Sequence, residues 1–354
     1  AIAAIGLVII MCVITALQYM AGGAILSSLL PEFFTFHGGM IMSAVVFIGI
    51  TLIGGLWSSG LANIVSVTLI YIGIIYSAIQ SVSNVGGWDA VLSKLPNPEV
   101  MGSPVAGLAF ATILGWIIVM ITQTITAQGP VQIACGAKNA KAARNGYVLA
   151  GLMIFPVGFI CAVLGVVCKA MYPEMPLSQA ALAMPKVVMT LDPLAGGVTL
   201  AALWAADVST ACNLLLSAGT LFSSDIYKRF INPQCDQARQ LLMTRACIII
   251  SGILTLGLAM SVSSILGTIM IGLSLTAAFS VIVIVALFFP QYASKAAGFW
   301  TLLAGLVLLV LWQLTPAVRI FPNVIYMEWL VCIAAYAIAA IICPAKKAVA
   351  AESN

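Results

Sequence analysis

The chain has 354 residues, of which 63% are hydrophobic and only 7% are charged. A soluble domain carries roughly 25% charged residues, so this composition, with a mean hydropathy of +1.17, excludes the soluble classes and places most of the chain in a lipid bilayer. The net charge of +4 comes from 14 Lys and Arg against 10 Asp and Glu, which is too few and too scattered for a nucleic-acid-binding surface.

Cysteine and histidine usage excludes the common metal and redox sites. The nine cysteines have no paired spacing, and His37 is the single histidine. We therefore expect neither a disulfide framework nor a zinc site. Because no nucleophile, acid pair or metal triad is found in the sequence, we also expect that the protein is not an enzyme.

Ten apolar stretches follow one another along the chain, and each is near the length that an α-helix needs to cross a bilayer. Backbone groups in lipid must be hydrogen-bonded within helices or closed barrels, and continuous apolar runs favour helices. The sequence therefore predicts an all-α integral membrane protein with about ten transmembrane helices. The predicted spans are 1–29, 39–56, 61–84, 105–127, 146–170, 195–223, 242–262, 264–289, 297–314 and 325–344.

The loop charges predict the orientation of these helices. Ten Lys and Arg residues fall on one side of the membrane and four on the other, and the positive-inside rule makes the richer side cytoplasmic. This predicts a multi-pass protein of the cell membrane with its C-terminus and the loops 130–145 and 225–241 in the cytoplasm. The acidic residues expected on the outer face are Glu32, Asp89, Glu99, Glu174, Asp192 and Glu328.

The first residues already lie inside an apolar run, which begins at Ala1 without a Met. This segment has neither the charged n-region nor the small-residue cleavage site of a signal peptide. We expect an N-terminally incomplete chain whose full length includes earlier helices.

The fourth span ends in an unusually polar stretch that closes with Gly-Pro. Transporters place their substrates at weakened helices near the midplane, where side-chain oxygens and freed backbone groups are available. These side chains are therefore candidate substrate-lining residues, and the alternative is a polar seam between helices that ends at a cytoplasmic turn. The five residues are Thr122, Gln123, Thr124, Thr126 and Gln128.

The sixth span contains Asp207, the one carboxylate that the pattern places deep within a span. A lone acid there costs at least ~2.5 kcal/mol and usually marks an ion or substrate path. Ala206, Ser209, Thr210 and Asn213 share one helix stripe, and hydroxyl and carbonyl oxygens are ligands of hard cations such as Na+. The alternative is that Ser and Thr bond back to the preceding turn and help helices to pack.

Three segments carry a family resemblance. The stretch 205–210 followed by 215–230, with Asp-Ile-Tyr-Lys at 225–228, is the most specific. The stretch 128–146 and the Gly-Gly-Leu triplet at 54–56 have matching order and spacing. Together they resemble the sodium:solute symporter family, whose members carry sugars, proline, pantothenate, carboxylates and similar solutes with Na+, and the similarity runs over nearly the whole chain.

The resemblance implies a bundle of two inverted five-helix repeats, as in the amino-acid transporters of the LeuT type. Residues 1–84 would be the end of the first repeat, with core helices 3 to 5, and residues 105–289 the second repeat, with core helices 6 to 10. Residues 297–344 would form two peripheral helices, and 345–354 a cytoplasmic tail. Two core helices would then lie outside this chain.

The resemblance also implies a Na+ site shared between the first core helix and the sixth span of this chain. Ala206 would supply a backbone carbonyl, and Ser209 and Thr210 would supply hydroxyls. Gln123 matches a position that bears an aromatic gate under the substrate in the sugar carriers. Thr122 and Thr124, beside it, become substrate-side candidates with it.

One position departs from the family pattern. The family usually has an Asp seven residues after the Gly-Gly-Leu triplet, and this chain has Asn63 there. Asp207 stands where the family commonly has an apolar residue. We hypothesise that the fixed negative charge has moved between helices, so that Asp207 balances the coupling cation or carries a proton. The alternative is that Asp207 pairs with a polar neighbour and only specifies packing.

These observations predict a secondary active transporter that couples symport of a small polar solute to a cation, Na+ in the first place, by alternating access. The alternatives are a proton-coupled carrier of the same fold, an ion channel, and a membrane sensor built on this fold. Because little sequence follows the last span, we expect the carrier and not the sensor. The expected partners are the solute and the lipid bilayer, with no nucleic acid, while the solute and the oligomeric state stay open.

Overall fold

The computed structural model describes the chain except for residues 54–55, 104–105, 127–130, 132–133, 262–264 and 345–354, and the side chains of 56–62, 177–178 and 265–266. Every regular element in the described residues is a helix, which confirms the all-α prediction. Nine helical spans in the described residues are at least 18 residues long and apolar enough to cross a bilayer; two of them, Pro193–Ile231 and Gly267–Phe288, each join two successive helical segments. In addition, α6 (Phe110–Thr126) is an apolar helix of 17 residues. The multi-pass membrane architecture is therefore confirmed.

The long helices match the predicted spans in order, with shifted ends. Short helices α4 (Trp88–Ser93), α5 (Pro98–Met101) and α9 (Ala183–Val188) lie in the connections. The helices that correspond to the predicted spans are α1 (Ile2–Leu29), α2 (Phe36–Ile53), α3 (Leu56–Val85), α6, α8 (Ala140–Met171), α10 (Pro193–Leu221), α11 (Gln237–Ser261), α12 (Ile265–Ser274) together with α13 (Thr276–Phe288), α14 (Lys295–Leu314) and α15 (Val324–Ile342).

Two of the predicted spans are more complex than single helices. The sixth continues beyond α10 as a π-helical segment, η2 (Phe222–Ile231), which carries Asp225, Lys228 and Arg229. The eighth is divided at Leu275 into α12 and α13. Apolar length alone predicts neither feature, because residues 222–231 and Leu275 include no proline or glycine that would mark a break in a helix.

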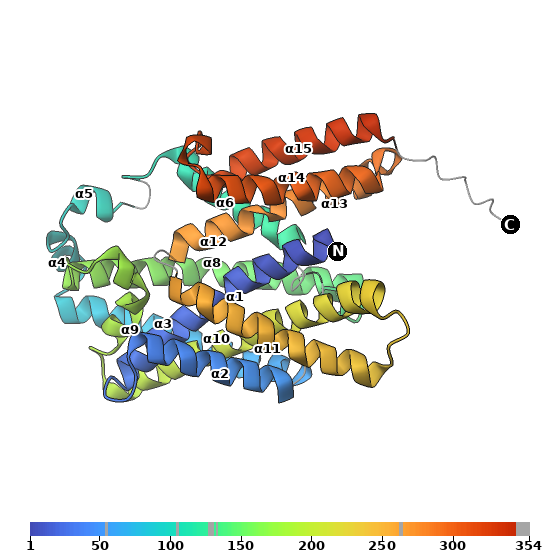
Figure 1. The fold of residues 1–354 in the computed structure, drawn as a ribbon. Coiled ribbons are helices and arrows are strands. Elements are labelled where there is room, and N and C mark those ends of the chain that lie inside the picture. The colour runs from blue at the N-terminus through green and yellow to red at the C-terminus, as the bar shows by residue number, and fades with distance from the viewer. Residues whose placement is uncertain (54–55, 104–105, 127–130, 132–133, 262–264, 345–354) are drawn as a thin grey trace. The chain divides into compact units, whose positions relative to one another are not determined.

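The chain divides into two compact units, each described by itself. Unit 2 comprises residues 11–108 and 133–265. Within it α10 packs against α3, α2 and α11, and α3 also packs against α8 (Figure 1). Gly73 of α3 allows the closest approach to α10, since a Cβ there would lie 2.6 Å from Oγ1 of Thr199. A row of rings, Tyr19, Phe47 and Trp204, fills the interior with centroid separations of 5.8 and 5.9 Å.

Unit 1 comprises residues 1–10, 109–132 and 266–354. Helices α14 and α15 form a long pair, and α13 packs against both of them and against α6 (Figure 1). At Gly305 the backbone of α14 comes so close to its neighbours that an added Cβ would lie 3.2 Å from the Ala278 Cβ and 3.3 Å from the Cys332 sulfur. On the other side of α13, Ser280 donates to the carbonyl of Thr122 at 3.3 Å.

Glu328 is not a surface residue. It was grouped with the acids of the outer face, but it is the fifth residue of α15 and has 0% of its surface exposed. Helix α15 begins at Val324, where the Asn323 side chain caps it by accepting from the Ile325 amide at 3.2 Å. The chain therefore carries a second carboxyl group inside its helices, in addition to Asp207.

Candidate functional site

The candidate ion site lies on α10, whose start is fixed by a local signal. The Asp192 side chain caps the helix by accepting from the amides of Leu194 and Ala195 at 3.2 Å, and Pro193 occupies the first helical position. Both features are standard helix starts. From this start α10 runs through the predicted stripe without interruption.

Two of the predicted oxygen ligands are adjacent. The Ser209 hydroxyl donates to the Ala206 carbonyl at 2.8 Å, and both residues are half-buried. This is the back-bonded geometry that the packing alternative expects. It also leaves the lone pairs of the hydroxyl oxygen beside the carbonyl oxygen, so the two oxygens share one side of the helix.

Thr210 and Asp207 differ from Ser209 in having no partner among the described residues. Thr210 is exposed, and its hydroxyl makes no hydrogen bond to another described residue. Asp207 is half-buried, and within the described chain its carboxyl makes neither a hydrogen bond nor an ion pair. Since the two residues are three positions apart on one helix, their side chains lie on neighbouring parts of one flank.

Asn63, the altered family position, lies on α3, the helix that packs most extensively against α10. The contact of Gly73 with Thr199 fixes the register of this pair. Asn63 is ten residues before Gly73, and Ser209 is ten residues after Thr199. Ten helical residues rise about 15 Å, so in an antiparallel pair Asn63 and Ser209 lie at the same level.

The predicted substrate-lining residues of α6 do not share one face. Thr122 and Thr126 are buried, whereas Thr124 is exposed. All three hydroxyls bond back to carbonyls of the preceding turn, those of Ile118, Met120 and Thr122, at 2.6 to 3.0 Å. Gln123 is half-buried, and its amide has no hydrogen bond within the described chain. Gln128 lies outside the described residues.

Five buried polar groups were missed by the sequence reasoning. The hydroxyls of Tyr19, Ser77 and Thr255 in unit 2, and Oε1 of Glu328 and the indole nitrogen of Trp329 in unit 1, are buried and have no hydrogen-bond partner in the described structure. For Glu328 the signal was available, because a single acid within an otherwise apolar run of helix length is the same pattern that singled out Asp207. For the other four groups no sequence signal distinguishes them from ordinary core residues.

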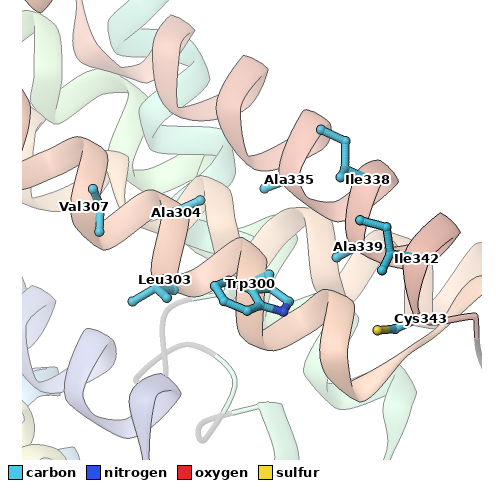
Figure 2. A pocket seen from close by; sticks show the side chains of 9 residues that line it. All are labelled: Trp300, Leu303, Ala304, Val307, Ala335, Ile338, Ala339, Ile342 and Cys343. Carbon is cyan, nitrogen blue, oxygen red and sulfur yellow. The ribbon is translucent and has the colours of Figure 1, made fainter.

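A hollow of about 390 Å³ lies between α14 and α15, and Figure 2 shows the side chains that line it. Its walls are apolar except for the Trp300 indole N–H and the Cys343 thiol, so it offers few partners for the polar groups of a small solute. We therefore do not assign the solute to this hollow. The lining residues are Trp300, Leu303, Ala304, Val307, Ala335, Ile338, Ala339, Ile342 and Cys343.

The described helices define a multi-span membrane protein of helical-bundle type. The family model of the sodium:solute symporter family matches residues 1–305. The chain therefore belongs to the sodium:solute symporter family, as the sequence motifs predicted. The family members to which it is similar are transporters and not enzymes.

The chain is also similar to curated relatives that are named sodium/glucose cotransporters. The chain is 24% identical over 276 residues to a sodium/glucose cotransporter of Vibrio parahaemolyticus, covering 67% of this chain and 49% of the relative. It is 25% identical over 332 residues to sodium/glucose cotransporter 4 of Mus musculus, covering 86% of this chain and 46% of the relative. The chain thus spans about half the length of the curated relatives it matches.

A solved structure confirms the fold. The structure of a Na+-coupled sialic acid symporter, in a substrate-bound outward-open state, matches with a TM-score of 0.73 over 98% of this chain and 75% of that chain. At 17% sequence identity the likeness shows the fold alone, which is the LeuT-type helical bundle predicted from the family resemblance.

Proposed function

We propose that this chain forms part of a Na+-coupled symporter that moves a small polar solute across the cell membrane by alternating access. Family membership and the LeuT-type fold support this proposal. Within it, residues 1–84 are the end of the first repeat, residues 105–289 the second repeat and residues 297–344 two peripheral helices. The C-terminus, from 345 to 354, lies in the cytoplasm.

The observation that carries the proposal is the cluster of oxygens on α10. A Na+ ion must exchange its hydration shell for protein oxygens, and hydroxyl and carbonyl oxygens suit a hard cation. The Ala206 carbonyl and the Ser209 hydroxyl lie 2.8 Å apart, and the Thr210 hydroxyl one position later has no partner among the described residues. We assign these three groups to one Na+, with further ligands from a helix outside this chain.

Asp207 and Asn63 complete the electrostatic part of the proposal. A cation in a membrane helix bundle needs a nearby negative charge, and the family's usual acid is replaced here by Asn63. Asp207 supplies the charge from the other helix of the same packed pair. Its carboxyl has no partner among the described residues, so it is available to the ion. In the proton-coupled alternative Asp207 itself carries the transported proton.

The solute side of the proposal rests on α6. Gln123 presents a half-buried amide without a hydrogen bond in the described structure, and amides serve polar solutes as both donor and acceptor. Thr122, Thr124, Thr126 and Gln128 surround it in sequence as further candidates. Neutral amide and hydroxyl groups suit sugars, amino acids and carboxylates alike, so the solute is proposed only as small and polar.

The test uses the complete protein in proteoliposomes. A panel of sugars, amino acids and carboxylates is screened for thermal stabilisation with and without Na+, since a ligand that binds the folded state raises its stability. For a stabilising solute, we expect accumulation against its gradient that stops when the Na+ gradient is removed. Flux that only follows the solute's own gradient would indicate a channel, and accumulation driven equally by a proton gradient alone would contradict Na+ coupling.

A further inference from the structure

Glu328 lies inside unit 1 at the meeting point of α13, α14 and α15, with 0% of its surface exposed. Its Oε2 accepts a hydrogen bond from the Cys332 thiol at 3.6 Å. The same oxygen would lie 3.2 Å from a Cβ placed on Gly305, so the α14 backbone packs directly against the carboxyl. Its Oε1 is buried and has no hydrogen-bond partner among the described residues.

No counter-charge in the described part of unit 1 neutralises this carboxyl. Lys295 is ten residues before Gly305 on α14, a rise of about 15 Å. The Arg319 guanidinium is occupied at the end of α14, where it donates to the carbonyls of Trp312 and Gln313 at 2.9 and 3.2 Å. Helices α6, α12 and α13 have no ionisable side chain. The other titratable groups of the surrounding elements are Tyr292, Tyr326, Cys332 and Tyr336.

These surroundings suit a neutral acid and not a carboxylate. An ionised carboxylate buried without a partner loses its hydration and gains nothing in return, which is among the most costly arrangements in a protein interior. A sodium ion needs several oxygen ligands, but among the described residues no polar group forms a hydrogen bond with Oε1. A proton on Oε1 removes the charge and needs no further ligand.

We propose that the Glu328 carboxyl is a proton-binding site of this protein, which holds its proton on Oε1 while α13, α14 and α15 are packed as in the structure. The site is separate from the polar flank of α10, which belongs to unit 2. Loss of the proton in the packed bundle would leave a bare charge next to Gly305 and Ala278. Release of the proton therefore requires these helices to separate, which links protonation of Glu328 to the packing of unit 1.

Infrared spectroscopy of the complete protein in lipid membranes tests the proposal directly. A protonated carboxylic acid and a carboxylate absorb at well-separated frequencies, and carbon-13 in the side-chain carboxyl of glutamate shifts only the bands of Glu residues. Near neutral pH we expect a protonated-acid band that moves with this label. Because Glu32, Glu99 and Glu174 are exposed, they contribute carboxylate bands. A label that shifts carboxylate bands only would overturn the proposal.

Two variants assign the band. Glu328→Gln keeps the shape of the neutral acid and should remove the protonated band, while Glu32→Gln, the matched control at an exposed position, should remove carboxylate absorption and leave that band intact. If Glu328→Gln removes carboxylate absorption instead, or if added Na+ shifts a carboxylate band of Glu328, the group is ionised and the proposal is wrong. Even if the variant does not fold, the absence of a labelled protonated-acid band in the wild-type protein would overturn the proposal.

Discussion

Neighbouring hydroxyls on α10 use their hydrogen-bonding capacity differently. Ser209 donates to the Ala206 carbonyl, while Thr210 is exposed and has no partner in the described structure. The spacing of these residues was sufficient to predict that they share a stripe, because the period of a helix is fixed. It could not predict which hydroxyl stays free, since that depends on rotamers and on what packs against the helix.

Asp207→Asn tests the charge assigned to the ion site. The substitution keeps the size of the side chain and removes its negative charge. If Asp207 balances the cation, the concentration of Na+ that half-saturates uptake should rise about tenfold or more, which corresponds to about 1.4 kcal/mol. Uptake by the complete protein in proteoliposomes, measured over a range of Na+ concentrations, gives this value. An unchanged Na+ dependence would leave Asp207 with a packing role only.

Asn63→Asp asks whether the charge can be returned to α3. In the Asp207→Asn background, the second substitution restores one carboxylate at the level of Ser209, and we expect it to recover a large part of the Na+ dependence. The double-mutant cycle isolates the coupling between the two positions. Strictly additive effects of the two substitutions would show that Asn63 and Asp207 do not serve the same ion.

Glu328 shows where residue-level reasoning failed. Its burial depends on the closeness of α14 at Gly305 and of α13 at Ala278, both far from it in sequence. The predicted span 325–344 already contained Glu328, but its place near the start of that span led us to group it with the acids of the outer face. Burial near a helix end depends on which helices pack against it, and the apolar pattern of one segment does not give that information.

At the scale of elements, the start of α10 was accessible to sequence reasoning and its end was not. Asp192 followed by Pro193 is a complete start signal. The continuation into the π-helical segment Phe222–Ile231 has no comparable signature, because it is held by contacts with α11. One of these is the Ser223 hydroxyl, which donates to the Gln240 carbonyl at 3.0 Å.

Gly73→Ala tests the packing of α3 against α10. The added Cβ would meet Thr199 at 2.6 Å from Oγ1 and 3.0 Å from both Cβ and Cγ2, so the two helices must move apart. We expect a loss of about 1–3 kcal/mol in the free energy of unfolding, measured as a lower melting temperature in detergent, together with weaker Na+ binding because α10 is displaced.

The matched control is Gly151→Ala on α8, where nothing lies within 4 Å of the added Cβ. This variant should be as stable as the wild type or slightly more stable, because alanine favours helices over glycine. Adding Thr199→Ala to Gly73→Ala should recover part of the lost stability, since the Thr199 side chain is what the new Cβ meets. Equal melting temperatures for Gly73→Ala and Gly151→Ala would contradict the described contact.

At the scale of the whole molecule, composition and apolar length were sufficient to predict a multi-pass helical protein, and motif resemblance was sufficient to predict its family. Both predictions depend on local properties, the apolar length and the motif of each single segment. The assignment of residues to one site requires knowledge of which helices pack together. Helices that pack together, such as α3 and α10, are far apart in the sequence. Their pairing could be predicted only from the family resemblance, and not from the pattern of either segment.

The predicted orientation places Cys343, which is exposed at the end of α15, on the cytoplasmic side. A membrane-impermeant maleimide added to intact cells should therefore leave Cys343 unmodified and should modify it after permeabilisation. Mass spectrometry of the peptide that contains Cys343 measures this separately from the other eight cysteines.

The control for this measurement is Ser93→Cys, at an exposed position of α4 on the predicted outer side. It should react in intact cells. Modification of Cys343 in intact cells, with the Ser93→Cys position protected until permeabilisation, would reverse the orientation assigned from the loop charges.

Binding of the coupling Na+ by the oxygens on α10 is tested most directly by equilibrium binding of radioactive Na+ to the complete purified protein, comparing Thr210→Val with Thr220→Val. Thr220 is on the same helix, but its hydroxyl donates to the Ser217 carbonyl at 3.0 Å. Removal of one ligand of a charged group is worth about 1.5–3 kcal/mol, so Thr210→Val should weaken binding about tenfold or more, while Thr220→Val should bind as the wild type does. Wild-type affinity in Thr210→Val would contradict the assignment.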